Sequence, residues 1–177
     1  MARINDWPGR SAAERLRQWP RILELSDAVA SAPFLGVVLL GSFARGEADG
    51  LSDVDFVVLA AEGAFEEAWA KRHRLHTDDA VCWDYPRPSG DRDVAGHRWL
   101  TADFVLFDGL IATPPGVRVA DPCHLLVGDD EEVSGQLVRR EPFTCEEMHE
   151  READLELHEI EQLYGQLKLA LRSHSPP

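Results

Sequence analysis

The chain has 177 residues, enough for one globular domain with a core and too few for two domains of ordinary size. It carries 32 acidic and 18 basic side chains, and its net charge of -14 disfavours general binding to nucleic-acid phosphates. Three cysteines without CxxC spacing predict reduced thiols, and the N-terminus lacks the apolar segment of a signal peptide. With no apolar run of membrane-spanning length, we expect a soluble, cytoplasmic protein.

The first half of the chain alternates helical patterns with apolar runs of strand length. Ser11 and Glu14 fit a capping box, and the helical stripe that follows is interrupted at Pro20, which predicts one kinked helix or two short ones. Glycine and small polar residues between two apolar runs predict a loop with at most a helical turn. The predicted elements are a helical region that ends at Pro33, a strand over 34–40, a loop over 41–51 and a strand over 52–59.

The second half predicts further strands and a long helix. The predicted elements are a helix over 65–76, a strand over 79–85, a loop over 86–96, a strand over 99–106, a turn over 114–116 and a strand over 124–127. The last helix, within about 144–172, has one apolar face. Its residues are Ala153, Leu157, Ile160, Tyr164, Leu167 and Leu171. We expect this face to pack on the domain or to pair with a second copy, as a homodimer. The whole chain, 1–177, is predicted to be a single domain.

Two carboxylates lie two positions apart in the predicted strand over 52–59. Because side chains alternate along a strand, Asp53 and Asp55 project from the same side. Their charges repel, and a half-buried pair of this kind is costly unless a cation neutralises it or one acid keeps its proton. Carboxylate oxygens on a rigid strand suit Mg²⁺, which commonly takes one or two carboxylates together with waters and substrate phosphates. The pair therefore predicts a magnesium site for a phosphorylated substrate.

The glycine-serine pair before this strand supplies groups of another kind. Gly41 allows backbone N–H groups to approach a phosphate closely, and the hydroxyl group of Ser42 can donate a hydrogen bond. Arg45 is close enough in sequence to add a charge-assisted contact. These residues predict a phosphate-binding loop beside the carboxylates.

Together, these residues resemble the nucleotidyltransferase superfamily related to polymerase beta. The resemblance is carried by Gly41-Ser42, ten intervening residues and Asp53-Val-Asp55, and the segment GSFARG is similar to that of small antibiotic nucleotidyltransferases and minimal nucleotidyltransferases. The order of predicted elements extends it to about residues 20–127. It implies an α/β (α+β) nucleotidyltransferase fold, with a mixed sheet, packed helices and a C-terminal helix.

The family also uses a third carboxylate on a neighbouring strand. Asp103 lies in the apolar context LTADFVLFDG and shares strand parity with Val105 and Phe107. Asp108 is the competitor, but it precedes Gly109 at the predicted strand end, where an aspartate is ordinary turn chemistry. We therefore place Asp103 ahead of Asp108. By resemblance, Asp53, Asp55 and Asp103 would be the catalytic acids and hold two Mg²⁺ ions, with Asp103 as the general base, while Gly41, Ser42 and Arg45 would bind the phosphates.

The resemblance implies transfer of a nucleoside monophosphate from a nucleoside triphosphate to a hydroxyl group, with release of pyrophosphate. We expect AMP to be transferred from ATP to a small molecule, with an aminoglycoside-like or lincosamide-like antibiotic as the leading acceptor. Two alternatives stay open, namely adenylylation of a partner protein of a toxin-antitoxin pair and a nucleotide-binding module without turnover.

Overall fold

A computed structural model describes residues 2–3, 7, 9–30, 33–85, 93–113, 118–120, 122–140 and 159–174. The chain divides into two compact units, residues 1–140 and 141–177. The first unit contains every strand that the structure describes. The prediction that 1–177 is a single domain stays a prediction.

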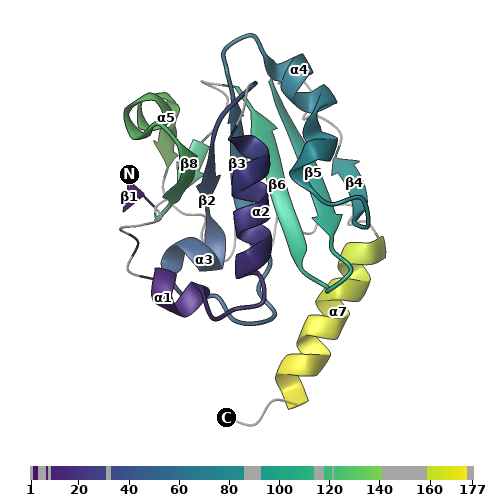
Figure 1. Ribbon diagram of the computed structural model, residues 1–177. Helices are drawn as coiled ribbons and strands as arrows, with labels where there is room; N and C mark the ends of the chain where they lie inside the picture. Colours follow the sequence, from purple (N-terminus) through teal and green to yellow (C-terminus); the bar gives the residue numbers. More distant parts are fainter. Residues whose placement is uncertain are drawn as a thin grey trace. The chain divides into compact units, whose positions relative to one another are not determined.

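The first unit is built on a seven-stranded mixed sheet, with the strand order β1-β8-β2-β3-β6-β5-β4 (Figure 1). β3 and β6 pair in parallel, whereas β2 with β3, β2 with β8, β5 with β6 and β4 with β5 pair antiparallel. The strands are β1 (Ala2–Arg3), β2 (Phe34–Leu39), β3 (Val54–Ala60), β4 (Val81–Tyr85), β5 (Val94–Leu100), β6 (Leu106–Ala112) and β8 (His124–Gly128). A separate two-stranded sheet pairs β7 (Arg118–Ala120) with β9 (Val138–Arg140).

Helices cover the face of the sheet on which Val37, Phe56 and Trp99 are buried (Figure 1). Ile22 and Leu25 of the longest of these helices are fully buried against that face. Of the apolar stripe predicted from the sequence, Trp19, Ile22 and Val29 are buried, whereas Leu23 is 46% exposed. The helices of the first unit are α1 (Arg10–Ala13), α2 (Trp19–Val29), α3 (Gly41–Arg45), α4 (Phe65–Ala70), the 3₁₀ helix η2 (Arg72–Leu75) and α5 (Asp130–Gln136). The opposite face buries a second cluster around Val57, Leu59 and Leu125.

Two details of the helical predictions are corrected. The capping box of Ser11 and Glu14 does not form, because α1 starts at Arg10 after Gly9 and has no side-chain cap. Pro20 lies in the first turn of α2, where the missing N–H group costs nothing, so this proline helps to start a helix instead of kinking one. The prediction of two short helices is therefore the one confirmed.

The largest correction concerns the strand predicted over 99–106. Residues 99–100 end β5, residue 106 begins β6, and Thr101 closes a turn between them by donating its backbone N–H to the carbonyl oxygen of Val105 at 3.0 Å. The apolar residues of this segment belong to two antiparallel strands joined by a tight turn. Composition does not show where the chain turns, and the segment therefore resembled one continuous strand. The same error assigned residues 94–96 of β5 to a loop.

In the second unit the structure describes α7 (Glu159–His174), which confirms the end of the predicted C-terminal helix. Tyr164 is buried, whereas Leu163, Leu167 and Leu171 are exposed. Ala153 and Leu157, which the apolar face was predicted to include, lie outside the described residues. Among the residues that the structure describes, no helix is long and apolar enough to cross a membrane.

Candidate active site

Two aspartates lie side by side where parallel strands β3 and β6 begin. Asp55 of β3 is the register partner of Asp108 of β6. Neighbouring strands are about 4.8 Å apart and paired residues project from the same face, so both carboxylates occupy one side of the sheet. Asp53, two residues before Asp55, is close enough for its negative charge to raise the pKa of Asp108. The three acids therefore gather at one end of the sheet, on the face opposite α2.

Arg98 of β5 completes this row of charges. It is the cross-strand partner of Asp108, and its Nε donates to Asp108 Oδ1 at 2.5 Å. Burial is the largest influence on the Asp108 carboxyl group and raises its pKa, whereas the Arg98 charge and hydrogen bond lower it; the net pKa is raised. The guanidinium of Arg98 also lies over the ring of Tyr85, with Cζ 4.2 Å from the ring centroid. Asp108 is thus a half-buried acid held by an arginine that is itself fixed on an aromatic ring.

Gly41 brings the start of α3 against the same carboxylates. Its backbone has a φ of 60°, and a Cβ at this position would lie 1.9 Å from Asp55 Oδ2. The backbone N–H of Leu40 donates to the carbonyl oxygen of Asp55 at 2.9 Å, which joins the end of β2 to the start of β3. Glycine is therefore required here both by the backbone conformation and by the closeness of the acid.

α3 also contacts a buried histidine that the sequence analysis did not identify. The Nε2 atom of His124 hydrogen-bonds the carbonyl oxygen of Ala44 at 2.9 Å, and the ring centroids of His124 and Trp7 are 5.4 Å apart. No sequence motif indicates this contact, since it joins residues 80 positions apart. Ser42 lies within α3 itself, directly after Gly41.

Arg45, the predicted phosphate ligand, has an intramolecular partner. Its Nε lies 2.7 Å from Glu47 Oε2, and both side chains are exposed. A bound phosphate would have to compete with this surface ion pair, which is itself weak. Contact between Arg45 and a phosphate stays a prediction.

Asp103, the predicted third acid, lies away from the strands. It occupies the turn between β5 and β6, its side chain is 45% exposed, and it forms an ion pair with Arg21 at 3.3 Å. Partial desolvation raises the pKa of Asp103, but hydrogen bonds from Thr101 and Arg21 outweigh it and the net pKa is lowered. The placement of Asp103 on a strand was wrong because the chain turns at 101–105; Asp108 takes the position beside Asp55.

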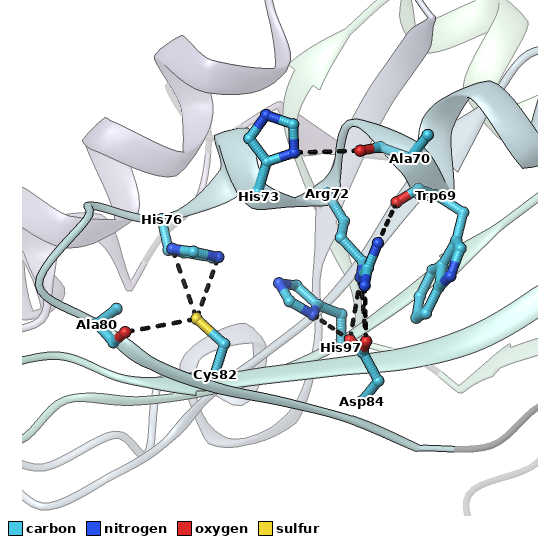
Figure 2. A network of polar contacts seen from close by, with 9 residues as sticks. All are labelled: Trp69, Ala70, Arg72, His73, His76, Ala80, Cys82, Asp84 and His97. Atoms are coloured by element: carbon cyan, nitrogen blue, oxygen red, sulfur yellow. Dashed lines mark hydrogen bonds and ion pairs between the residues drawn. The ribbon is translucent and has the colours of Figure 1, made fainter.

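A second polar network lies on the other face of the sheet, between η2, β4 and β5 (Figure 2). Asp84 accepts from Arg72 Nη2 at 2.8 Å and from His97 Nδ1 at 2.7 Å, and these partners outweigh burial and lower the pKa of Asp84. Burial and the charge of Asp84 raise the pKa of the Cys82 thiol, whose Sγ lies 3.1 Å from His76 Nε2. The network borders a cavity of about 430 Å³. A protonated thiol is a poor nucleophile, so this cluster does not resemble an activated-cysteine site.

Neither cluster forms a ready-made metal cage. Within the described ranges, no three His, Cys, Asp or Glu side chains are arranged to hold an ion by themselves.

Comparison with known proteins gives one family match. Residues 24–105 match the model of the nucleotidyltransferase domain, a range that includes Gly41, Asp53 and Asp55 and ends three residues before Asp108. No curated protein sequence matches the chain. The match and the mixed sheet with packed helices confirm the predicted superfamily and fold class.

Solved structures with detectable likeness include Cid1, a poly(U) polymerase. Cid1 in complex with the UTP analog UMPNPP is 17% identical, with a TM-score of 0.37, and the match covers 60% of this chain and 30% of that one. Cid1 with its short product ApU is 18% identical, with a TM-score of 0.35 and the same coverage. A further Cid1 structure gives 18% identity and a TM-score of 0.35 over 62% of this chain and 30% of that one. The matched part thus spans less than a third of the length of these proteins, and at these TM-scores the likeness supports no conclusion about substrate.

Proposed function

Since residues 24–105 form a nucleotidyltransferase domain of the polymerase beta-like superfamily, we propose that Asp53, Asp55 and Asp108 carry out nucleotidyl transfer in this chain. A nucleoside monophosphate passes from a nucleoside triphosphate to an acceptor hydroxyl, and pyrophosphate leaves. The observation that carries the proposal is that Asp55 is the register partner of Asp108 and lies beside Gly41. Gly41 and Asp55 lie inside the matched range, and Asp108 lies three residues beyond its end. Sequence reasoning named Asp103 for the third position; we assign it instead to Asp108.

Asp53 and Asp55 fit the ligand chemistry of Mg²⁺. Both offer hard carboxylate oxygens, and the charge of Asp53 already disfavours ionisation of Asp108, a repulsion that a cation relieves. A bound magnesium ion, or the two ions expected from the resemblance, would neutralise charge on the triphosphate and on the acceptor oxygen. Asp53 and Asp55 would hold it together with the phosphates of ATP or another nucleoside triphosphate.

The remaining tasks fall to residues around the acids. Asp108 accepts the proton of the acceptor hydroxyl at its carboxylate, and its raised pKa makes it a better base than an exposed aspartate. Arg98 holds that carboxylate in one orientation through the 2.5 Å contact. Gly41 and Ser42 bind the outer phosphates, and Arg45 contributes there after exchanging Glu47 for a phosphate oxygen.

The acceptor is proposed from charge alone. A net charge of -14 attracts cations and repels polyanions, which supports a cationic small molecule such as an aminoglycoside over a nucleic acid. We also propose that the transferred group is AMP and that the protein is cytoplasmic. The cytoplasm keeps thiols reduced and contains magnesium-bound ATP.

The test is pyrophosphate release from each nucleoside triphosphate with Mg²⁺, across aminoglycosides, lincosamides, an RNA oligonucleotide and a protein extract with α-labelled ATP. We expect release that requires one acceptor class and disappears in Asp55→Asn. Transfer of the label to RNA or to a protein would show that the acceptor is not a small molecule, while the proposal of nucleotidyl transfer would stand. No release and no binding of Mg-ATP by calorimetry would contradict nucleotidyl transfer itself.

A further inference from the structure

Gln18, directly before α2, is a fully buried glutamine that contacts the loop leading to Asp53. Its Nε2 donates to the carbonyl oxygens of Asp49 at 2.9 Å and Ser52 at 2.8 Å. The Oε1 atom of the same side chain is buried and has no hydrogen-bond partner among the residues that the structure describes. Burial of this amide is therefore compensated only by the two bonds that its nitrogen makes to the loop.

Arg17 joins the same loop to a second one. Its Nε donates to the carbonyl oxygen of Gly50 at 2.7 Å, and its two terminal nitrogens donate to the carbonyl oxygens of Asp103 and Phe104, each at 3.1 Å. A guanidinium has five N–H donors in a rigid planar fork, and here one fork spans two chain segments. Lysine, with a single donor centre, cannot reproduce this arrangement.

Both contacted segments lead directly into the strands that carry the acids. The loop over 49–52 is followed by Asp53 and β3, and the turn over 101–105 is followed by β6 with Asp108. Because β3 and β6 are parallel neighbours, their entering ends lie side by side, and Arg17 bridges the two entrances.

The second segment has a backbone conformation that needs support. Phe104 has a φ of 61°, which is costly for a residue with a bulky side chain, and its side chain is 55% exposed and so gains little from packing. Arg17 holds the carbonyl group of this residue, and Arg21 holds the adjacent Asp103 side chain. The acid that sequence analysis placed in the site is thus part of the support for the strand that carries Asp108.

We propose that Arg17 and Gln18 are positioning residues for nucleotidyl transfer, which fix the separation of Asp53 and Asp55 from Asp108. The inference rests on the function proposed above, but neither residue lies within the matched family range, and the hydrogen bonds described for their side chains go to backbone carbonyl groups of the two loops. Loss of the bridge lets the two strand entrances move independently, and a displacement on the order of 1 Å at reacting groups lowers rates by about 100-fold.

Arg17→Ala is the informative variant, because Arg17 is exposed and its removal leaves the buried core intact. Arg17→Lys keeps the charge but loses the fork, and Arg15→Ala removes an exposed arginine two positions away as the matched control. Gln18→Leu tests the buried bonds as a second site. For each protein we would measure amide hydrogen exchange, the Mg²⁺ concentration for half-maximal pyrophosphate release, and kcat.

Arg17→Ala and Arg17→Lys should both exchange faster at residues 46–53 and 101–108, with exchange in β2 unchanged. Their kcat should fall by about tenfold or more and their Mg²⁺ midpoint should rise, whereas Arg15→Ala should match the wild type. A purely structural role would leave the Mg²⁺ midpoint unchanged, because misfolded molecules lower the rate without altering the metal dependence of the rest.

Unaltered exchange at both segments in Arg17→Ala, or a wild-type Mg²⁺ midpoint in an active variant, would overturn the inference while leaving nucleotidyl transfer in place. A wild-type protein that neither binds Mg-ATP nor releases pyrophosphate would overturn the proposed function and, with it, a positioning role in catalysis. In that case faster exchange confined to the two segments would show only that Arg17 stabilises them.

Discussion

At the scale of single residues, the closeness of Gly41 to Asp55 determines how the start of α3 and the acids meet. Gly41→Ala would add a Cβ 1.9 Å from Asp55 Oδ2 at a backbone φ of 60°. Gly63 is a matched control, since its φ is 73° and a Cβ there meets nothing within 4 Å. Both substitutions should lower the free energy of unfolding by about 1 kcal/mol, because alanine is disfavoured in the left-handed backbone conformation. Only Gly41→Ala should also lower the rate of pyrophosphate release, by about 100-fold. Equal activity of the two variants in a steady-state assay would contradict the packing described here.

His97 provides a pH-dependent prediction. Burial lowers the pKa of His97, although the hydrogen bond and charge of Asp84 act in the opposite direction. Below the ordinary histidine pKa of 6.5 the unfolded chain takes up a proton that the folded chain resists, so folding loses stability as pH falls from about 7.5 to about 5.5. His97→Gln should lose less stability over this interval, as measured by urea unfolding at both pH values. An equal loss in the wild type and the variant would show that His97 titrates normally in the folded state.

Asp53 and Asp55 could be proposed as site residues from the sequence, because a glycine-serine pair followed at a set spacing by two acids two positions apart is a recognisable pattern. Sequence reasoning placed Asp103 ahead of Asp108 as the third acid, whereas in the structure Asp108 is the register partner of Asp55. Both acids lie in one apolar run, and the choice depends on where that run turns. The turn contains Phe104 in the left-handed backbone conformation, which a phenylalanine in the sequence does not predict.

At the scale of elements, the pairing of β3 with β6 depends on a glycine that makes room for an aromatic ring. Phe56 and Gly109 are register partners, and a Cβ at Gly109 would lie 2.1 Å from the Phe56 ring. Gly109→Ala should therefore destabilise the protein by about 1–3 kcal/mol through overpacking. Gly135→Ala, at an exposed position of α5 where a Cβ meets nothing within 4 Å, should instead stabilise it by about 0.5–1 kcal/mol. Chemical denaturation measures both effects, and a neutral Gly109→Ala would contradict the packing of Phe56.

The central elements were predictable because strands buried on both faces give continuous apolar runs. β2 and β3 appear where the sequence predicts them, and both are almost entirely buried. The start of β5 was assigned to a loop because Ala95 and Gly96 are small and directly follow the glycine, proline and charged residues of that segment. Only the cross-strand neighbours show that these residues are buried.

At the scale of the whole molecule, association through the C-terminal helix stays a prediction. Leu163, Leu167 and Leu171 are exposed on α7, at helical spacing along one side. If this side joins two copies, Leu167→Glu with Leu171→Glu should halve the mass measured by light scattering and raise solubility. A monomeric mass for the wild-type protein would contradict the predicted homodimer. Leu157, the other residue of interest for this face, lies outside the described residues.

The central claim is that Asp108, and not Asp103, acts with Asp53 and Asp55. The most direct measurement is kcat for pyrophosphate release by Asp108→Asn and Asp103→Asn, each checked for folding by thermal unfolding. We predict a loss of about 100-fold or more for Asp108→Asn, because a base and its charge are removed, and a loss within about tenfold for the exposed, turn-bound Asp103→Asn. The reverse order, with Asp103→Asn inactive and Asp108→Asn near the wild-type rate, would contradict the site described here.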